Sequence, residues 1–314
     1  MLPPPQYLYG VLGMPLAQSL SPALHTWGFT RSGHPGAYFA WEKNTDELPA
    51  FFATVRSLPI AGLSVTIPHK QAVIPFLDQL TPRAQAVGAV NLIYRQGERL
   101  VGDNTDVAGF LAPLLKLRDA GKKLPDRALL LGAGGAGRAV LAGLRELGLT
   151  EVWIAARNAA KAEALARDFS CRTLTWNDRE QALADLGPIL AINATPLGMA
   201  GTFAGQSPLP ALPLLTLPDQ VNAWFIYDIV YNPVQTPLLA TARERGMTCI
   251  DGLDFFVAQA REQFRLWTGA ELPGMETREL VLGILEKRNQ DPENSEAVFR
   301  CCGVQGHHAP AGGV

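Results

Sequence analysis

The segment Leu129-Leu-Leu-Gly132-Ala-Gly-Gly-Ala-Gly137-Arg-Ala139 lies near the middle of the 314-residue chain. An apolar run of strand character leads into glycines at positions 132, 134, 135 and 137, and a helical pattern follows. This context is typical of a dinucleotide-binding turn, in which glycines let the backbone approach a pyrophosphate at a helix N-terminus. A tight turn without a ligand is the alternative. More than a hundred residues precede the turn, and we expect them to hold the molecule with which the nucleotide reacts.

Composition is typical of a globular protein. Hydrophobic residues make up 47% and charged residues 18% of the sequence, with a formal net charge of −2. At about 150 residues per domain, the length predicts two domains. Without a basic block, we expect no nucleic-acid partner. No apolar run is long enough to span a bilayer and no signal peptide is recognisable, so we expect no membrane contact and a cytoplasmic location.

The first hundred residues alternate between strand-like and helix-like segments. Apolar runs predict strands at 7–12, 37–41 and 63–67, and helical patterns predict helices at 22–32, 46–57 and 68–77. Strand-like segments at 89–94 and 99–103 flank Arg95-Gln-Gly-Glu98, which is typical of a hairpin. The pattern predicts an α/β unit with a mostly parallel sheet and an antiparallel edge.

The rest of the chain predicts a second α/β unit. A helix at 107–120 precedes strands at 128–131, 151–156, 189–193 and 225–230, with helices at 136–147 and 158–168. This order predicts a mostly parallel, doubly wound sheet of the Rossmann type. The Gly- and Pro-rich segment 199–218 is predicted to be a loop. Two more helices, at 252–267 and 276–287, are expected to pack back on the first unit.

We therefore predict a substrate domain of residues 1–106 plus 250–288, a nucleotide-binding domain of residues 107–249, and a cleft between them. The polar, Gly-rich residues 289–314 predict a flexible tail. The cysteines are Cys171, Cys249, Cys301 and Cys302, and none forms a Cys-x-x-Cys pair. We expect free thiols and no metal site, the alternative being a metal bound adventitiously by the tail.

Two hydroxyls lie in the first polar cluster, Ser19-Leu-Ser21-Pro22, between a strand and a helix. Ser21 stands where an N-cap is expected, so capping is the simpler interpretation. The same two hydroxyls would also suit a substrate carboxylate.

A predicted strand ends within the second cluster, Ser64-Val-Thr66-Ile-Pro68-His-Lys70, and the alternating residues Ser64 and Thr66 of this strand point to one side. Lys70 then falls on the first turn of a predicted helix, where the dipole favours loss of its proton and thus suits proton transfer. A solvated surface lysine is the alternative. Two further clusters are Gly88-Ala-Val-Asn91 and Gly102-Asp-Asn-Thr-Asp106. The second stands at a strand end before an apolar helix, and Thr105 or Asp106 is the expected N-cap of that helix.

From about Tyr9 to Leu285 these clusters, in this order, closely resemble the shikimate dehydrogenase family. Further carrying motifs are Ile192-Asn-Ala-Thr-Pro-Leu-Gly198, Tyr227-Asp-Ile-Val-Tyr-Asn-Pro233, and Asp251-Gly-Leu253 with Gln259 beyond it. The resemblance implies NADP-dependent reduction of 3-dehydroshikimate to shikimate, a step of chorismate and aromatic amino-acid biosynthesis. The expected partner is this small-molecule substrate, and a homodimer is a further expectation.

The resemblance implies roles for particular residues. Lys70 would be the acid/base at the reacting oxygen, and Asp106 would pair with it and bind substrate hydroxyls. Ser19, Ser21 and Tyr231 would hold the carboxylate, while Ser64, Thr66, Asn91 and Gln259 would bind the ring. The implied cofactor site comprises Gly132, Ala133, Gly134, Gly135, Ala136, Gly137, Arg157, Asn158, Lys161, Thr195, Ile229 and Gly252.

The residues after the second strand of the nucleotide-binding unit predict which nucleotide binds. NAD-preferring folds of this type place Asp or Glu there, whereas an Arg accommodates a 2′-phosphate. Here the strand ends in Ala156-Arg157-Asn158, with Lys161 one turn further and no acid among them. We therefore expect NADP, the alternative being an Arg157 that only covers the sheet edge.

Two departures from the family pattern stand out. Ser64 occupies a position where many members carry Asn, and Asp254 and Phe255 follow Gly-Leu where glycine and methionine are common. The second change raises the question of how the nicotinamide fits. A quinate/shikimate dehydrogenase is the nearest alternative function, and a non-catalytic NADP-binding sensor is the alternative from another class. Because a sensor needs neither Lys70 nor Asp106, the pair favours an enzyme.

Overall fold

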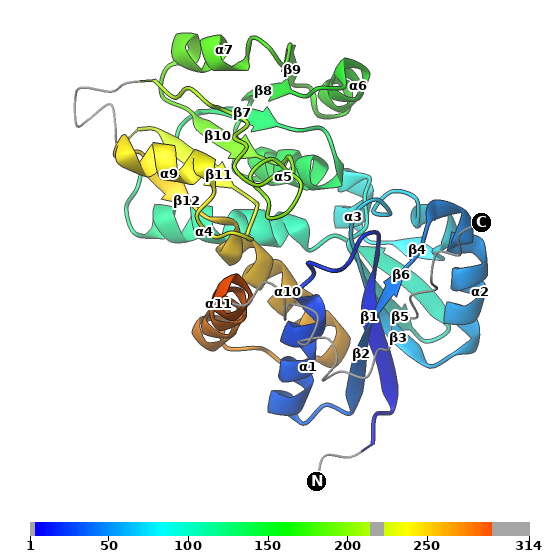
Figure 1. Ribbon diagram of the computed structural model, residues 1–314. Helices are drawn as coiled ribbons and strands as arrows, with labels where there is room; N and C mark the ends of the chain where they lie inside the picture. Colours follow the sequence, from blue (N-terminus) through cyan, green and yellow to red (C-terminus); the bar gives the residue numbers. More distant parts are fainter. Residues whose placement is uncertain (1–3, 214–222, 291–314) are drawn as a thin grey trace, which may run out of the picture.

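The computed structural model describes residues 4–213 and 223–290, which form two six-stranded sheets with helices packed around them (Figure 1). Residues 7–103 supply the first sheet and residues 127–250 the second. The predicted α/β class with two mostly parallel sheets is therefore confirmed.

The first sheet has the strand order β2-β1-β3-β5-β6-β4. Its pairs are parallel except β3–β5 and β5–β6, because β5 and β6 form the predicted hairpin. The hairpin turns at Gly97, whose φ of +62° suits a residue without a Cβ. The outermost strand is β4, so the antiparallel hairpin does not form the edge that we expected. The strands are β1 Tyr7–Gly13, β2 Gly36–Glu42, β3 Ile60–Val65, β4 Gln79–Leu80, β5 Leu92–Gln96 and β6 Arg99–Asp103.

The second sheet is parallel throughout, in the order β12-β11-β10-β7-β8-β9. From β7 the chain runs outward through β8 and β9, and it then returns to the other side of β7. The carboxyl ends of β7 and β10 therefore form a topological switch point, where open α/β sheets bind ligands. The strands are β7 Arg127–Leu131, β8 Glu151–Ala155, β9 Arg172–Leu174, β10 Leu190–Asn193, β11 Phe225–Asp228 and β12 Thr248–Ile250.

Helices lie around both sheets and join them. Helix α10 contacts α1 and α4 as well as β3 and β5, and it runs between the two halves of Figure 1. Its apolar stripe of Leu253, Phe256, Val257, Ala260 and Phe264 is buried, which fixes its position. The helices of the first half are α1 Ser21–Ser32, η1 Thr45–Glu47, α2 Leu48–Ser57, η2 Ile74–Phe76 and α3 Pro82–Val87. Those that follow are α4 Asp106–Asp119, α5 Gly135–Glu146, α6 Ala159–Phe169, α7 Arg179–Leu186, α9 Pro237–Glu244, α10 Gly252–Thr268 and α11 Gly274–Gln290.

The helix predicted at 68–77 is wrong. These residues form successive turns that end in the short 3₁₀ helix η2. The carbonyl of Lys70 accepts a hydrogen bond from the backbone N–H of Val90 at 2.7 Å, so a distant segment takes the acceptor that a helix would use. Lys70 therefore does not lie on the first turn of a helix, and its own segment does not supply the dipole that we expected to act on it.

Two smaller expectations also change. The N-cap of α1 is Leu20 rather than Ser21, and no side chain caps the helix; Ser21 is its first residue. Helix α11 continues to Gln290, into the first two residues of the predicted tail. The rest of that tail, with Cys301 and Cys302, lies outside the described residues, as do residues 214–218 of the predicted loop.

Candidate active site

Lys70 and Asp106 form a close ion pair. The Nζ atom of Lys70 lies 2.5 Å from Oδ2 of Asp106, and the two side chains are only 14% and 4% exposed. Asp106 is the first residue of α4. Its second oxygen, Oδ1, accepts a hydrogen bond of 2.7 Å from the Nδ2 group of Asn91. The carboxylate is thus held between one cation and one amide.

The backbone around Asp106 is also fixed by amides. Oδ1 of Asn91 accepts a bond of 2.7 Å from the N–H of Thr105, which sets the orientation of the Asn91 amide. Asn104 donates to the carbonyl of Ala89 and accepts from the N–H of Asp106. The strand-end cluster is therefore a scaffold for Asp106, with Thr105 as the N-cap of α4.

Asp103 has a structural role in this cluster. It accepts hydrogen bonds from Arg83 at 2.7 Å and from Thr81 at 2.6 Å. Burial tends to raise the pKa of Asp103, but the bonds from Arg83 and Thr81 outweigh it and hold that pKa below its usual value. Asp103 therefore remains a carboxylate paired with Arg83.

Among the predicted ring-binding residues, Asn91 lies next to the Lys70–Asp106 pair, and Ser64 is already hydrogen bonded within the protein. Its Oγ atom lies 2.7 Å from the Tyr38 hydroxyl and 2.6 Å from Oε1 of Gln263. Gln259 accepts a bond of 2.8 Å from Gln263, and its Oε1 atom lies 3.5 Å from Asn91 Nδ2. Thr66, one residue beyond β3, is partly exposed.

Sequence reasoning missed Tyr38 and Gln263. Gln263 lies four residues after Gln259 on α10, and this spacing, which puts two side chains on one helix face, is the signal that was available. Tyr38 lies on β2, and nothing in its sequence context connects it with residue 64.

The predicted carboxylate-binding residues are brought together from distant segments. The Oγ atom of Ser19 accepts a bond of 3.3 Å from the N–H of Ser21. The hydroxyl of Tyr231 lies near the backbone of Leu20, between those serines, and its ring stacks on that of Phe256 with the centroids 4.4 Å apart. Burial raises the pKa of Tyr231 to about 12, so its hydroxyl stays protonated and suits an anionic acceptor.

The glycine turn has the geometry of a nucleotide cradle. Gly132 has φ of +113°, and a Cβ there would lie 2.8 Å from the carbonyl oxygen of Ala194. A Cβ on Gly137 would lie 2.9 Å from the carbonyl oxygen of Gly132. Gly134 is exposed, with no atom within 4 Å of the position that a Cβ would take, and Gly135 begins α5. Open space at a helix N-terminus fits a pyrophosphate.

The residues after β8 suit a 2′-phosphate. Arg157, Asn158 and Lys161 are all exposed. Oδ1 of Asn158 accepts a bond of 3.0 Å from the N–H of Lys161 and so caps α6. No acidic residue lies between Ala155 and Lys161 to repel a phosphate. The two cations near this turn therefore favour NADP.

Of the remaining predicted cofactor residues, Thr195 and Ile229 lie on loops beside the buried pair of Asn193 and Asp228, and Gly252 is the first residue of α10. Asn193 Oδ1 accepts bonds from the N–H and hydroxyl of Thr195, at 2.9 and 2.7 Å. Asn193 Nδ2 donates to Asp228 Oδ1 at 2.9 Å. A Cβ on Gly252 would lie 2.5 Å from the carbonyl oxygen of Ile229, so only glycine permits this crossing. Asn193 and Asp228 belong to motifs that carry the family resemblance, but the resemblance implied no role for either.

Asp228 is a buried carboxylate with an altered proton affinity. Burial raises the pKa of Asp228 to about 7, although hydrogen bonds from Thr236, Val230 and Asn193 act in the opposite direction. Because the folded state retains the proton more strongly, this group contributes stability below pH 4 that is lost as the pH rises through 7.

The departures from the family pattern are accommodated by packing. Phe255 is 8% exposed and joins the buried cluster that contains Phe110 and Tyr227. Asp254 forms an ion pair with Arg278 at 2.8 Å. The bulk of Phe255 is therefore taken up by the protein core.

The two halves of the site meet at Gly135. A Cβ on Gly135 would lie 3.2 Å from both Cβ and Cδ of Lys70, so the N-terminus of α5 lies against the Lys70 side chain. Arg138, on the same helix, donates to the carbonyl of Val87 at 2.7 Å. The nucleotide turn and the Lys70–Asp106 pair are therefore adjacent.

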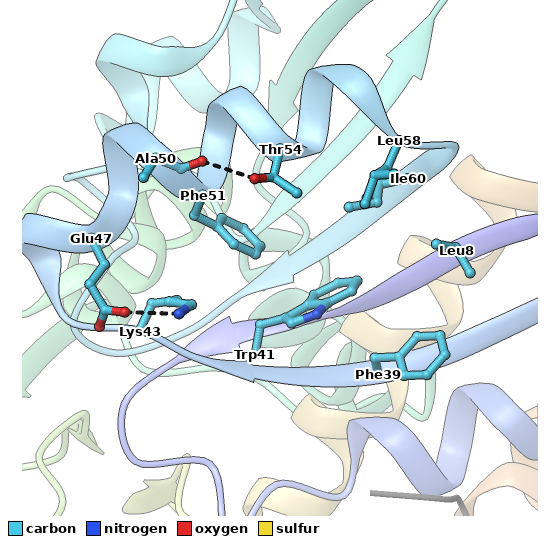
Figure 2. A pocket seen from close by; sticks show the side chains of 10 residues that line it. All are labelled: Leu8, Phe39, Trp41, Lys43, Glu47, Ala50, Phe51, Thr54, Leu58 and Ile60. Atoms are coloured by element: carbon cyan, nitrogen blue, oxygen red, sulfur yellow. Dashed lines mark hydrogen bonds and ion pairs between the residues drawn. The ribbon is translucent and has the colours of Figure 1, made fainter.

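A separate apolar groove of about 560 Å³ lies beside β2 and α2 (Figure 2). Trp41 and Phe51 line it, and the ion pair of Lys43 with Glu47 lies at one side. The residues lining it include none of the predicted site residues. Within the described ranges no His, Cys, Asp or Glu cluster is arranged to hold a metal ion, and Cys171 and Cys249 are free thiols. None of the described helices is long and apolar enough to cross a membrane.

An ion-paired lysine beside a nucleotide turn, between two α/β units, defines the class of two-domain nucleotide-dependent dehydrogenases. The profile described as "Shikimate dehydrogenase substrate binding domain" matches residues 11–93, and "Shikimate / quinate 5-dehydrogenase" matches residues 117–195. "Shikimate 5'-dehydrogenase C-terminal domain" matches residues 252–274. The chain belongs to the shikimate dehydrogenase family.

Individual relatives support this assignment. The shikimate dehydrogenase (NADP(+)) of Oleidesulfovibrio alaskensis is 47% identical, covering 90% of this chain and 96% of the relative. The structure of shikimate 5-dehydrogenase from Thermus thermophilus, in complex with NADP(H) and shikimate, is 36% identical with a TM-score of 0.71 and covers 88% of this chain and 98% of its own. Quinate dehydrogenase from Corynebacterium glutamicum, in complex with NAD, has a TM-score of 0.77 at 28% identity, covering 88% and 99%.

Proposed function

We propose that this chain interconverts 3-dehydroshikimate and shikimate with NADP as the hydride carrier, within chorismate and aromatic amino-acid biosynthesis. The observation that carries the proposal is the buried Lys70–Asp106 pair lying against the N-terminus of α5. The relatives that are NADP-dependent shikimate dehydrogenases match over nearly their whole length, which supports the same substrate and cofactor here.

In this proposal Lys70 handles the proton. When bound, the reduced nicotinamide supplies a hydride to the carbonyl carbon of the substrate. The Lys70 ammonium gives its proton to the carbonyl oxygen, which becomes the hydroxyl of shikimate. Asp106 orients Lys70 and accepts a bond from a substrate hydroxyl, while Asn91 holds the second carboxylate oxygen. General acid–base assistance of this kind contributes about 10²–10⁴ in rate.

The other residues bind and orient. Ser19, Ser21 and the protonated Tyr231 suit the substrate carboxylate as neutral donors. Thr66, Asn91, Gln259 and Ser64 suit the ring hydroxyls. A rigid polyol held by short, fixed hydrogen bonds is discriminated strongly, because an analogue lacking a hydroxyl leaves buried partners unpaired.

The nucleotide would lie across the second sheet. The turn of Gly132–Gly137, including the half-buried Ala133 and Ala136, suits the pyrophosphate. Arg157, Asn158 and Lys161 suit the 2′-phosphate, and Thr195, Ile229 and Gly252 suit the nicotinamide end. Residues 1–106 plus 250–288 would form the substrate domain and residues 107–249 the nucleotide domain, closing about the segments near residues 107 and 250.

Steady-state oxidation of shikimate and quinate, each with NADP and with NAD, tests the proposal. We expect the highest kcat/KM with shikimate and NADP. Faster turnover of quinate would favour the quinate dehydrogenase alternative, to which the similar quinate dehydrogenase structure gives some support. Binding of NADPH without turnover of any pair would favour the non-catalytic sensor.

A homodimer and a cytoplasmic location are also proposed. Light scattering coupled to gel filtration tests the first, and cell fractionation with an antibody to the chain tests the second. A mass corresponding to a single 33.8 kDa chain would contradict the dimer.

A further inference from the structure

A continuous chain of buried side chains connects Tyr38 with Asp106. Tyr38 contacts Ser64, Ser64 contacts Gln263, and Gln263 contacts Gln259, at 2.7, 2.6 and 2.8 Å. Asn91 then lies 3.5 Å from Gln259. Tyr38, Ser64, Asn91, Gln259 and Gln263 are each at most 8% exposed, so water cannot readily substitute for a lost member.

The direction of each bond can be worked out from the chemistry of the groups. Gln263 Oε1 is an acceptor only, so the single proton of Ser64 is donated to it. Ser64 therefore accepts from Tyr38, whose hydroxyl stays protonated because burial raises the pKa of Tyr38 well above its ordinary value. Gln263 Nε2 faces the other way and donates to Gln259 Oε1 and, at 3.2 Å, to the carbonyl of Asn91.

These directions determine what the pocket offers a ligand. Because Gln263 donates to Gln259 Oε1, the Gln259 amide is fixed with Nε2 bonded to the carbonyl of Phe256 at 3.0 Å. The second N–H of the Gln259 Nε2 group is left to donate to a ligand. The proton of Ser64 is committed to Gln263, so Ser64 can only accept from a substrate hydroxyl. An Asn at residue 64 would carry a donor and an acceptor itself, whereas here the amide is supplied by Gln263.

We propose that Gln263 is a positioning residue that sets the donor and acceptor pattern of the substrate pocket through Gln259 and Ser64. Tyr38 supports it by donating to Ser64 from the far side. Gln263 does not itself contact the reacting atoms, and Lys70 and Asp106 do not depend on it for their pairing. The inference rests on the proposed function, in which Gln259 and Ser64 line the shikimate site.

The test compares Gln263→Met, which keeps the length of the side chain but has no amide, with Ser64→Ala and the double variant. Each single variant leaves a buried hydrogen-bonding partner misplaced, so we expect its KM for shikimate to rise about tenfold to hundredfold. We expect kcat to stay within about threefold, because the loss is in binding rather than in proton transfer. Because Gln263 and Ser64 share a hydrogen bond, the double variant should raise KM by less than the product of the two single changes.

The neighbouring substitution Phe264→Leu is the matched control, since it loosens the same buried helix without touching an amide. It should leave KM for shikimate unchanged at a comparable loss of thermal stability. An unchanged KM in Gln263→Met, additive effects in the double variant, or an equal rise in Phe264→Leu would each overturn the proposal. Shikimate turnover by the unaltered chain tests the proposed function separately, so failure of the two ideas is distinguishable.

Discussion

Replacing Lys70 by alanine removes the proposed proton donor and one of the two side-chain partners that hold the Asp106 carboxylate. The loss of general acid–base assistance should lower kcat by about 10²–10⁴, which corresponds to about 3–5 kcal/mol on the barrier. KM should change little, because the proposed substrate-binding residues Asn91, Gln259, Ser19 and Ser21 are unchanged. The expected signature is thus a loss in kcat alone.

The same substitution carries a separate cost in stability. Asp106 is only 4% exposed, and without Lys70 the Asn91 amide is left to hold its carboxylate. Removing one partner of a buried ion pair costs about 3–5 kcal/mol in the free energy of unfolding. The double variant Lys70→Ala/Asp106→Asn removes the unpaired charge, so it should regain much of this stability while kcat stays low.

The assay follows NADPH absorbance with 3-dehydroshikimate as substrate, alongside urea denaturation of each variant. Single-turnover measurements show whether hydride transfer or product release limits the rate. A rise in KM with kcat unchanged would refute the catalytic role and leave Lys70 as a binding residue. A kcat that recovers in the double variant together with stability would show that misfolding caused the loss.

Three further predictions concern the nucleotide half. Arg157→Ala should raise KM for NADP about tenfold to hundredfold and leave KM for NAD unchanged, unlike the control Arg167→Ala on α6; equal effects on both nucleotides would contradict a 2′-phosphate contact. Burial raises the pKa of Asp228 from 3.8 to about 7, and this shift corresponds to a loss of about 4 kcal/mol in the free energy of unfolding between pH 4 and 7. Asp228→Asn should therefore flatten the pH dependence of urea unfolding over that range. Gly132→Ala, at φ +113°, should lose more stability than the control Gly121→Ala at φ +81°, because the methyl added at residue 121 meets no atom within 4 Å. Gly132→Ala should also weaken NADPH binding, measured by fluorescence titration.

Much of the architecture was predictable because its determinants are local. The glycine turn at 132–137 requires a positive φ and close backbone contacts, so strand, turn and helix were found with nearly their observed bounds. Asn91 directly precedes β5 and the cluster ending at Asp106 closes β6; because these two strands are antiparallel neighbours, with Leu92 opposite Asp103, the two clusters meet as a consequence of sheet order. Short elements such as β4, β9 and α7 were not identified, since two to eight residues carry too little periodicity.

The helix expected at 68–77 shows where local reasoning fails. Its sequence pattern resembles a helix, but the carbonyl of Lys70 is taken by the backbone of Val90, twenty positions along the chain. Long-range hydrogen bonding therefore overrides local propensity. A helix N-terminus does lie against Lys70, but it belongs to α5 of the other half.

By itself, the sequence determined the α/β class, the nucleotide turn, the absence of an acid after β8 and the identity of the polar clusters, because each depends on residues close in the chain. Only the tertiary structure decided the partners. The pairing of Lys70 with Asp106 was expected from the family resemblance, but the structure alone placed Gly135 against Lys70 and linked Tyr38, Ser64 and Gln263 from β2, β3 and α10. These contacts depend on how strands order within a sheet and on where α10 packs, and such long-range geometry leaves no local pattern in the sequence.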